Sequence, residues 1–419
     1  MSKTVSSPED FFYLNKVMYK ICGVWLPGRD VRVLKKILYF LYVLGYYTIY
    51  GGFLICEFLI FNEMLGDIGK FASYIGMLFT HLVGILKWSV VVFHRKRIQK
   101  MMNALQDPKY RYDPVDEFQP NLLLLEGKWI SSIFTILLFV MYSGVGISAD
   151  ISSQISIHRA MKSDLLEGNL TCFDFMPYYF YVPFIPTTKR QCGYIFLFMD
   201  ISLGLHAWLI ACYDGVFVGI LNCLKLQLII VGGAFKTIRR RCLKTLNLPK
   251  EFSVLHDEEN LEMERKLYEE LNRCTKHLNL LLRTRDDIEH CFSYVTLAQT
   301  LASLFILATC LYNSSTIPIT SPEFFSQLEY CMCILIQLSL ICWFGNEITS
   351  ASNEITLSIY DGDWYSTSPR FKRSMILTMC RMQRSVYLSI GKFSPLNLTT
   401  LVAVCRGSFS YFTVLKSVK

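Results

Sequence analysis

The sequence has none of the short motifs that mark common catalytic or nucleotide-binding sites. It contains no H-E-x-x-H, no G-x-S-x-G and no phosphate-binding P-loop, and its seven histidines are dispersed. No inverted repeat typical of secondary transporters is visible. The nearest cysteine pair, Cys331 and Cys333, lies in an apolar run where such side chains pack well. An enzyme or a transporter is therefore disfavoured, and neither a metal nor a cofactor is expected.

Charged residues are also scarce. They make up 18% of the 419 residues, whereas 52% are hydrophobic and 14% aromatic, and the mean hydropathy is +0.34. A soluble domain balances its core with a charged surface, so this composition indicates a polytopic membrane protein. The first thirty residues lack the apolar core of a cleavable signal peptide. The first membrane helix is therefore expected to act as its own insertion signal.

Seven segments are long and apolar enough to span a bilayer, which requires about 20 residues per helix. They cover residues 37–61, 69–93, 129–148, 192–224, 291–317, 324–344 and 394–418. The prediction is an all-α membrane protein with seven transmembrane helices.

Lysine and arginine fix the expected orientation, because loops rich in them stay cytoplasmic. Four segments carry 33 of the 42 basic residues, namely 1–36, 94–128, 225–289 and 347–392. The alternate loops 62–68 and 313–323 carry none, and 149–191 carries four. The N-terminus is therefore predicted to be cytoplasmic and the C-terminus extracellular. This is the reverse of a G-protein-coupled receptor, and the chain has neither a D-R-Y triplet nor N-P-x-x-Y.

Two glycosylation sequons agree with this topology. Asn169 and Asn313 both fall in predicted outer loops, whereas a third sequon, at Asn397, lies at the membrane edge and is attributed to chance. Cys172 and Cys192 lie on the same oxidising side and are candidates for a disulfide, which the sequence does not prove.

Several helices are expected to continue beyond the bilayer. Between Asp257 and Thr309 there is neither proline nor glycine, and apolar residues recur there at heptad-like spacing: Leu267, Leu271, Cys274, Leu278, Leu281 and Ile288. The fourth span runs on toward Pro249, and segment 369–390 is amphipathic. A cytoplasmic helical anchor bundle, built from extensions of the fourth, fifth and sixth spans and a helix before the seventh, is one interpretation. A basic linker is the other.

The C-terminal third contains a dense set of residues that form one recognisable pattern: Gln383, Arg384, Gly391, Lys392, Phe393, Pro395, Leu396, Leu398, Ser410, Tyr411, Phe412, Thr413 and Leu415. This pattern resembles the signature ending of insect odorant receptors, and the span pattern resembles that family over essentially the whole chain. Two positions depart from the family pattern, since members often have proline at Ser385 and serine at Asn397.

The resemblance implies a ligand-gated, non-selective cation channel in the plasma membrane of sensory neurons. A tuning subunit such as this one would bind a small volatile organic ligand and assemble with co-receptor subunits into a heterotetramer. Monovalent and divalent cations would pass through its pore, and no nucleic acid is involved. The implied organisation is a cytoplasmic N-terminal segment 1–36, a ligand-binding bundle 37–224 with outer loop 149–191, anchor helices 225–290, spans 291–348, an anchor loop and helix 349–393, and a pore helix 394–419. A G-protein-coupled chemoreceptor is the alternative, which a cytoplasmic C-terminus would revive.

The last span has one helical face that is a candidate pore lining, with Val414 in the position of the family's hydrophobic gate. Packing of this face against neighbouring helices is the alternative. The face consists of Thr400, Val404, Gly407, Tyr411, Val414 and Val418.

Charged residues inside the spans raise a separate question. Arg406 is expected either to find a carboxylate or carbonyl partner or to extend to the cytoplasmic edge. Lys87 and Asp214 lie toward the cytoplasmic ends of their spans, where solvation would explain them. Lys416 is expected to face away from the pore axis.

A small apolar ligand requires an enclosed, mostly apolar pocket, and family members have theirs in the outer halves of the second to sixth spans. The aromatic outer loop around residue 178 is expected to cover this pocket or to rest at the lipid headgroups. Helical spacing selects these candidate contacts: Phe71, Tyr74, Ile75, Leu78, Met141, Tyr142, Val145, Phe196, Met199, Ser202, Leu203 and Tyr312.

Overall fold

The protein is almost entirely helical, as expected. The computed structural model describes residues 10–25, 32–66, 68–162, 176–184, 186, 188–249 and 257–417. Within them, seven helices are long and apolar enough to cross a membrane. The elements, in chain order, are α1 (Tyr13–Ile21), α2 (Val33–Leu59), α3 (Phe61–Met64), α4 (Ile68–Leu105), η1 (Pro108–Tyr110), α5 (Pro120–Lys162), α6 (Lys189–Lys236), α7 (Ile238–Thr245), η4 (Asp257–Glu259), α8 (Leu261–Thr316), α9 (Pro322–Tyr360), α10 (Pro369–Met382), β1 (Ser389–Ile390), β2 (Ser394–Pro395) and α11 (Leu398–Ser417).

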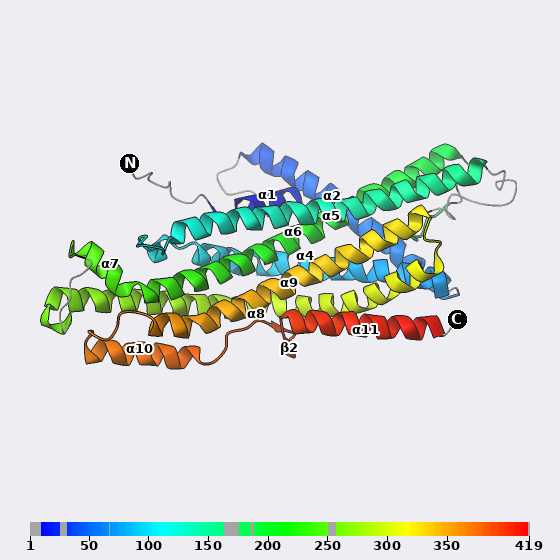
Figure 1. The fold of residues 1–419 in the computed structure, drawn as a ribbon. Coiled ribbons are helices and arrows are strands. Elements are labelled where there is room, and N and C mark those ends of the chain that lie inside the picture. Colours follow the sequence, from blue (N-terminus) through cyan, green and yellow to red (C-terminus); the bar gives the residue numbers. More distant parts are fainter. Residues whose placement is uncertain are drawn as a thin grey trace.

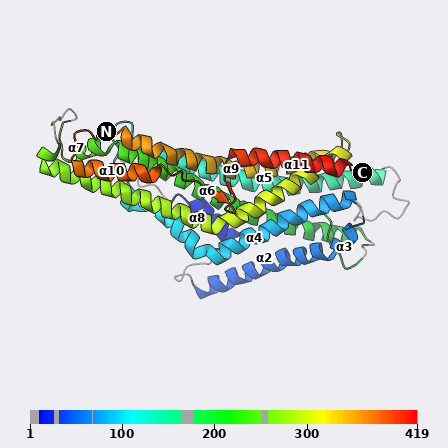
Figure 2. The ribbon, with the colours of Figure 1, turned by 90° about the horizontal axis from the view of Figure 1, so that it is seen from below.

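Helix α6 is the centre of the molecule. It packs against α2, α4, α5, α8 and α9, and 89% of its most apolar window is buried, compared with 11% for α11. Figure 2 shows α11 and α2 at opposite edges, with α4 and α8 between them. Such a low buried fraction for so apolar a helix means that α11 presents most of its surface to lipid or to another chain.

The heptad-like residues of α8 are all buried, between 0% and 2% exposed. They pack inside a group of helices at the end of the molecule remote from the C-terminus (Figure 1). We call this group the distal bundle; it consists of α7, α10, the first half of α8 and the end of α9. Asn260 caps α8 by accepting a hydrogen bond from the Met263 amide (3.1 Å). With 56 residues, α8 is about 84 Å long at 1.5 Å per residue. One rigid helix therefore connects the distal bundle to the spanning half.

Ion pairs reinforce the distal bundle. Arg241 pairs with Glu270, and Arg239 pairs with Asp257 at 3.2 Å. Asp257 is fully buried and also accepts a hydrogen bond from the Ser366 hydroxyl (2.7 Å). Because a buried carboxylate requires several donors, these contacts fix the turn before α8 against the segment before α10.

A tight hairpin positions the start of α11. Strands β1 and β2 pair antiparallel, with Ser389 opposite Pro395 and Ile390 opposite Ser394. Gly391 has φ +57° in the turn, and its amide donates to the Ser293 carbonyl of α8 (3.1 Å). A Cβ there would lie 2.5 Å from Leu297 Cδ2, so only glycine fits. This turn belongs to the Gly391-Lys392-Phe393 motif of the signature ending.

Gly345 provides a second close approach, between α9 and the chain entering α11. A Cβ on it would lie 2.7 Å from Leu396 Cγ and 3.1 Å from the Leu396 carbonyl carbon. A Gly345→Ala substitution is expected to destabilise the fold by about 1–3 kcal/mol through overpacking, although alanine is the better helix former. Thermal unfolding in detergent measures this. The control is Gly51→Ala in α2, where a Cβ meets nothing within 4 Å; an equal change in both variants would contradict the contact.

Candidate ligand cavity and the exposed helix α11

A cavity of about 540 Å³ lies within the spanning half of the molecule. Its walls come from α4, α5, α6, α8 and α9, together with Tyr178 from the segment after α5. The size is typical of sites that enclose a drug-sized or smaller ligand. The aromatic segment after α5 therefore reaches the cavity wall.

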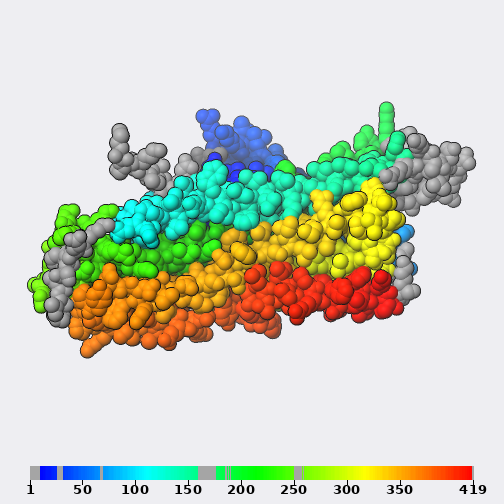
Figure 3. Space-filling model, in the orientation of Figure 1, coloured from blue at the N-terminus to red at the C-terminus, as the bar shows by residue number. Residues whose placement is uncertain are grey.

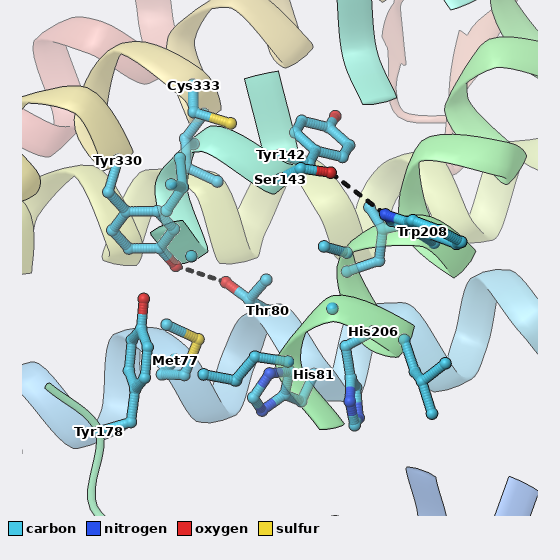
Figure 4. Close-up of a pocket in the computed structure, with 18 of the residues that line it drawn as sticks. Met77, Thr80, His81, Tyr142, Ser143, Tyr178, His206, Trp208, Tyr330 and Cys333 are labelled. Carbon is cyan, nitrogen blue, oxygen red and sulfur yellow. Dashed lines mark hydrogen bonds between the residues drawn. The ribbon is translucent and has the colours of Figure 1, made fainter. Parts of the chain in front are cut away.

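The cavity wall combines apolar surface with a few paired polar groups (Figure 4). The Tyr330 and Thr80 hydroxyls lie 2.6 Å apart, and the Trp208 indole N–H donates to the Ser143 hydroxyl (3.2 Å). These bonds join α4 to α9 and α5 to α6. Because their donors and acceptors already satisfy one another, they orient aromatic rings around the cavity and leave a ligand mostly apolar surface to contact.

A buried ion pair lies against the cavity. Lys87 Nζ is 2.7 Å from Asp214 Oδ1, and the two side chains are 1% and 5% exposed. Asp214 Oδ2 also accepts from the Tyr142 hydroxyl (2.8 Å) and from Gln337 Nε2 (2.5 Å). The expectation that Lys87 and Asp214 are solvated is therefore wrong: the packing of α4 against α6 removes both from water, and each neutralises the other.

Two histidines lie side by side in another part of the wall (Figure 4). The rings of His81 and His206 are 4.3 Å apart between centroids. His81 Nδ1 is 2.8 Å from Glu57 Oε2, and His206 Nδ1 is 2.8 Å from the Ser202 carbonyl oxygen. Dispersed along the sequence, these histidines gave no local signal, and only the packing of α4 on α6 brings them together.

Three of the twelve candidate ligand contacts line the cavity: Tyr142, Val145 and Leu203. The other nine are not among its wall residues. Met141 packs in a cluster beside the cavity, Ser202 is fully buried, and Tyr312 is 3% exposed. The remaining six pack in two clusters elsewhere: Phe71, Tyr74, Ile75 and Leu78 around Met64, and Phe196 and Met199 around Phe53.

The difference on α4 is one of helical face. At 100° per residue, Phe71, Tyr74 and Leu78 lie on one side, whereas the wall residues Thr80, Val83 and Lys87 lie on the opposite side. The other two wall residues of α4, Met77 and His81, lie between these two sides. Helix α4 buries both sides, so an apolar stripe marks burial without showing which stripe faces the cavity.

Helix α11 lies along the outside of the molecule (Figure 3). Its inward side chains are Val404, 5% exposed, and Ser408, 2% exposed, whereas Val414 is 57% exposed. Tyr411 lies 5.4 Å from Phe305 of α8 between ring centroids. A Cβ on Gly407 would lie 3.0 Å from Leu304 of α8.

The predicted pore stripe is therefore divided between two surroundings. Val404 belongs to the chain's own core, so the expectation that it faces an open pore is wrong. The apolar residues on this side of α11 pack against α8 instead. Thr400 is partly exposed and bonded to Asn397, and Val418 lies outside the described residues. Arg406 is exposed, and no ion pair to it exists within the described part of the chain.

The predicted loop modifications have different outcomes. Asn169 and Cys172 lie outside the described residues, and Cys192 is disulfide-bonded. Asn313 is only 6% exposed in the last turns of α8. A glycan is attached to a surface asparagine, and the helix continues through this sequon; the modification of Asn313 stays a prediction.

Comparisons with known proteins agree on one family. The family model described as 7tm odorant receptor matches residues 67–409. Odorant receptor Or1 of Anopheles gambiae is 21% identical over 98% of this chain and 96% of that protein. Odorant receptor 46a, isoform B, of Drosophila melanogaster is 28% identical over 53% of this chain and 55% of its own length.

The fold is also that of a solved structure. The insect olfactory receptor OR5 from Machilis hrabei, in complex with eugenol, superposes with a TM-score of 0.73 at 14% identity, covering 98% of this chain and all of that one. A family match across most of the chain, with seven membrane-competent helices in this arrangement, identifies a multi-pass membrane protein. The chain belongs to the seven-transmembrane odorant receptor family of insects.

Proposed function

We propose that this chain is the ligand-binding subunit of a ligand-gated, non-selective cation channel. It binds a small volatile in the cavity between α4, α5, α6, α8 and α9 and assembles with co-receptor subunits into a heterotetramer. The α11 helices of the four subunits surround the pore. The cavity and the exposed α11 are the two features that this function requires.

The position of α8 carries the proposal. Its residues Gln299, Ala302 and Ile306 line the cavity, whereas Leu304 and Phe305 contact α11. One helix thus contacts the ligand space with one side and the proposed pore helix with the other. A ligand that binds more tightly when α8 is displaced favours that position of α8, and α11 moves with α8. The equilibrium between the two positions changes only by the difference in the ligand's affinity for them.

The orientation follows from the basic residues. The distal bundle contains α7 with Arg239, Arg240 and Arg241, and such segments stay cytoplasmic. The distal bundle, which lies within segments 225–290 and 349–393, then anchors the subunits below the membrane, with 1–36 also inside and loop 149–191 outside. The location is the plasma membrane of sensory neurons. A G-protein-coupled chemoreceptor would require the opposite topology.

Whole-cell current tests this function. The chain is expressed alone and with an insect odorant co-receptor, and a panel of volatile esters, alcohols, aldehydes and aromatics is applied. A fast cation current that requires the co-receptor and persists with G-protein signalling blocked supports the channel. A response abolished by that blockade supports the alternative. Silence with both chains at the cell surface counts against both.

Val414 offers a more local test. Its side chain is 57% exposed on α11, and a ring of such valines would close a pore by excluding water. Val414→Ala is expected to increase the ligand-independent current at least severalfold, measured with the co-receptor at matched surface abundance. Val404→Ala is the control because Val404 is buried in the chain's own core. Equal leak from both variants would remove Val414 from the gate.

A further inference from the structure

The cavity wall reaches the outer surface of the molecule between α5 and α6. Ile147 of α5 and Ile201 and Trp208 of α6 line the cavity, yet they are 59%, 44% and 42% exposed. The wall residues that α4, α8 and α9 contribute are buried or half-buried. The cavity therefore has an open side, and that side lies along the seam between α5 and α6.

This seam is tightly closed in the half of the two helices that is nearer the distal bundle. Asn222 of α6 donates to the Gly127 carbonyl of α5 (2.9 Å). Farther along, a Cβ on Gly215 of α6 would already lie 3.0 Å from Thr135 of α5. The contacts advance along α5 as they go back along α6, so the two helices run antiparallel. Their backbones nearly touch there and leave no passage for a small molecule.

The seam opens beyond the hydrogen bond between Trp208 and Ser143. Gly146 lies three residues farther along α5, and Gly204 lies four residues back along α6, so the two glycines are at about the same level. Both belong to the cavity wall. A Cβ added to either glycine meets nothing within 4 Å. The space between the two helices at this level is therefore unfilled and continuous with the cavity.

The surface around this gap is apolar. Ile147 and Ile151 of α5 and Leu197 and Ile201 of α6 are each between 44% and 59% exposed. Helix α5 runs along the edge of the molecule opposite α11 (Figures 1 and 3), and α11 is the proposed contact with the other subunits. An apolar surface of this extent, remote from that contact, is suited to lipid.

Two carboxylates indicate the depth of the gap. Asp150 follows Gly146 by four residues on α5, and Asp200 precedes Gly204 by four residues on α6. Both therefore lie about 6 Å farther toward the outer ends of their helices. Asp200 is exposed and Asp150 is half-buried, and such charges are costly inside hydrocarbon. The gap then lies in the outer leaflet, just below the level of the lipid headgroups.

We propose that the ligand enters this cavity from the outer leaflet of the bilayer, through the gap between Gly146 and Gly204. This route rests on the proposed function for its orientation and for taking the cavity as the ligand site. A molecule that uses it must first dissolve in the leaflet, so the ligands are uncharged and lipophilic. The absence of side chains at the two glycines then sets the rate of entry and of release.

Cys333 of α9 lines the cavity (Figure 4) and reports access without any known odorant. The full-length chain in lipid nanodiscs is treated with benzyl methanethiosulfonate, an uncharged lipophilic thiol reagent, and the modification of Cys333 is followed by mass spectrometry. Gly146→Leu and Gly204→Leu fill the gap, and neither displaces a neighbour at its Cβ. Each is expected to slow the modification about tenfold, the effect of about 1.4 kcal/mol of added barrier.

A matched control lies on the same helix. Gly193 of α6 also has nothing within 4 Å of an added Cβ, but it does not line the cavity, so Gly193→Leu should react at the wild-type rate. Gly204→Ala should slow the reaction less than Gly204→Leu. Misfolding would expose Cys333, which is 4% exposed in the folded chain, and would accelerate its modification. It therefore cannot mimic the expected result.

Three outcomes would overturn the route through the leaflet. The first is a wild-type rate in both leucine variants, and the second is a wild-type Cys333 that the uncharged reagent does not modify. The third concerns the cationic 2-(trimethylammonium)ethyl methanethiosulfonate, with each reagent's rate divided by its rate with a simple thiol in solution. Modification by this reagent at least as fast as by the uncharged one would indicate entry from water, past Asp150 and Asp200.

Currents with the co-receptor separate this route from the proposed function. A barrier to passage slows entry and release alike, so onset and washout of the evoked current should slow by the same factor in Gly204→Leu, with the half-maximal concentration unchanged. Slowed modification of Cys333 without any odorant-evoked current would reject the channel and leave the route standing. Evoked current with wild-type onset and washout in both leucine variants would reject the route and leave the channel standing.

Discussion

A Lys87→Met variant is expected to lose about 3–5 kcal/mol of folding free energy, the usual consequence of removing one partner of a buried ion pair. Lys87 and Asp214 are 1% and 5% exposed and lie 2.7 Å apart. Methionine has nearly the same length and flexibility as lysine, so it leaves no large cavity. The loss therefore comes from the Asp214 carboxylate, which stays buried without its counter-ion.

The neighbours of Asp214 explain why a neutral partner recovers stability. Tyr142 and Gln337 both donate to Asp214 Oδ2, and Gln337 in turn accepts from Gln299 of α8 (2.8 Å). Asparagine at position 214 keeps an acceptor oxygen for these donors and removes the charge. In the double variant Lys87→Met, Asp214→Asn no charge is left unpaired, and most of the stability should return.

Melting temperatures of the four proteins in detergent, together with their abundance at the cell surface, form a double-mutant cycle. Each single variant should be much less stable than the wild type, and the double variant should be more stable than either single one. Additive losses, or single variants that melt like the wild type, would show that the two charges do not depend on each other. Lys416→Met, on the exposed surface of α11, controls for loss of a lysine.

This ion pair also shows what sequence patterns reveal and what they omit. The seven spans, the buried heptad residues of α8 and the family were all predictable, because hydropathy and helical period act within one segment. Lys87 and Asp214 are 127 positions apart. Neither spacing nor composition indicates that two charges on different helices will meet, so the sequence alone predicts solvation near the membrane edge.

The candidate ligand contacts illustrate a second limit. On α4 the sequence marks Phe71, Tyr74 and Leu78 as a buried stripe, and they are indeed packed, yet against Met64 and its neighbours. A helix buried on two sides has two such stripes, and only the positions of the other helices decide which one borders a cavity. On α5 the sequence does identify the wall residues Tyr142 and Val145, because the buried positions there follow a single face: Leu138, Tyr142, Val145 and Ala149.

Helix α11 shows the same ambiguity at the proposed pore. A stripe of small and β-branched residues suits a pore lining, but it suits close packing of two membrane helices equally well. Val404 packs in the chain's own core, and Gly407 packs against α8. Val414 remains exposed, so the stripe joins the subunit's core to the surface that other subunits would meet.

Gly407 lies where α11 passes from packing on α8 to the exposed surface, and the largest functional change is expected at this position. A Cβ there already approaches Leu304 of α8 to 3.0 Å, so a leucine at 407 must push α11 off α8. Because α8 is the proposed link between cavity and pore, ligand-evoked current relative to basal current should fall at least tenfold. The cavity itself is untouched, so ligand-induced thermal stabilisation of the purified protein should remain.

A graded series separates loss of coupling from loss of folding. Gly407→Ala meets only the flexible end of Leu304 and should retain most of the evoked current, since that side chain can rotate aside. Gly51→Leu in α2, where nothing lies within 4 Å of the added Cβ, controls for leucine in place of a helical glycine.

Loss of evoked current in Gly407→Leu together with loss of ligand binding would indicate misfolding. An unchanged ratio of evoked to basal current would mean that contact between α8 and α11 at this position does not transmit the ligand's effect. Loss of current with binding retained is the result that places the transmission between Leu304 and Gly407.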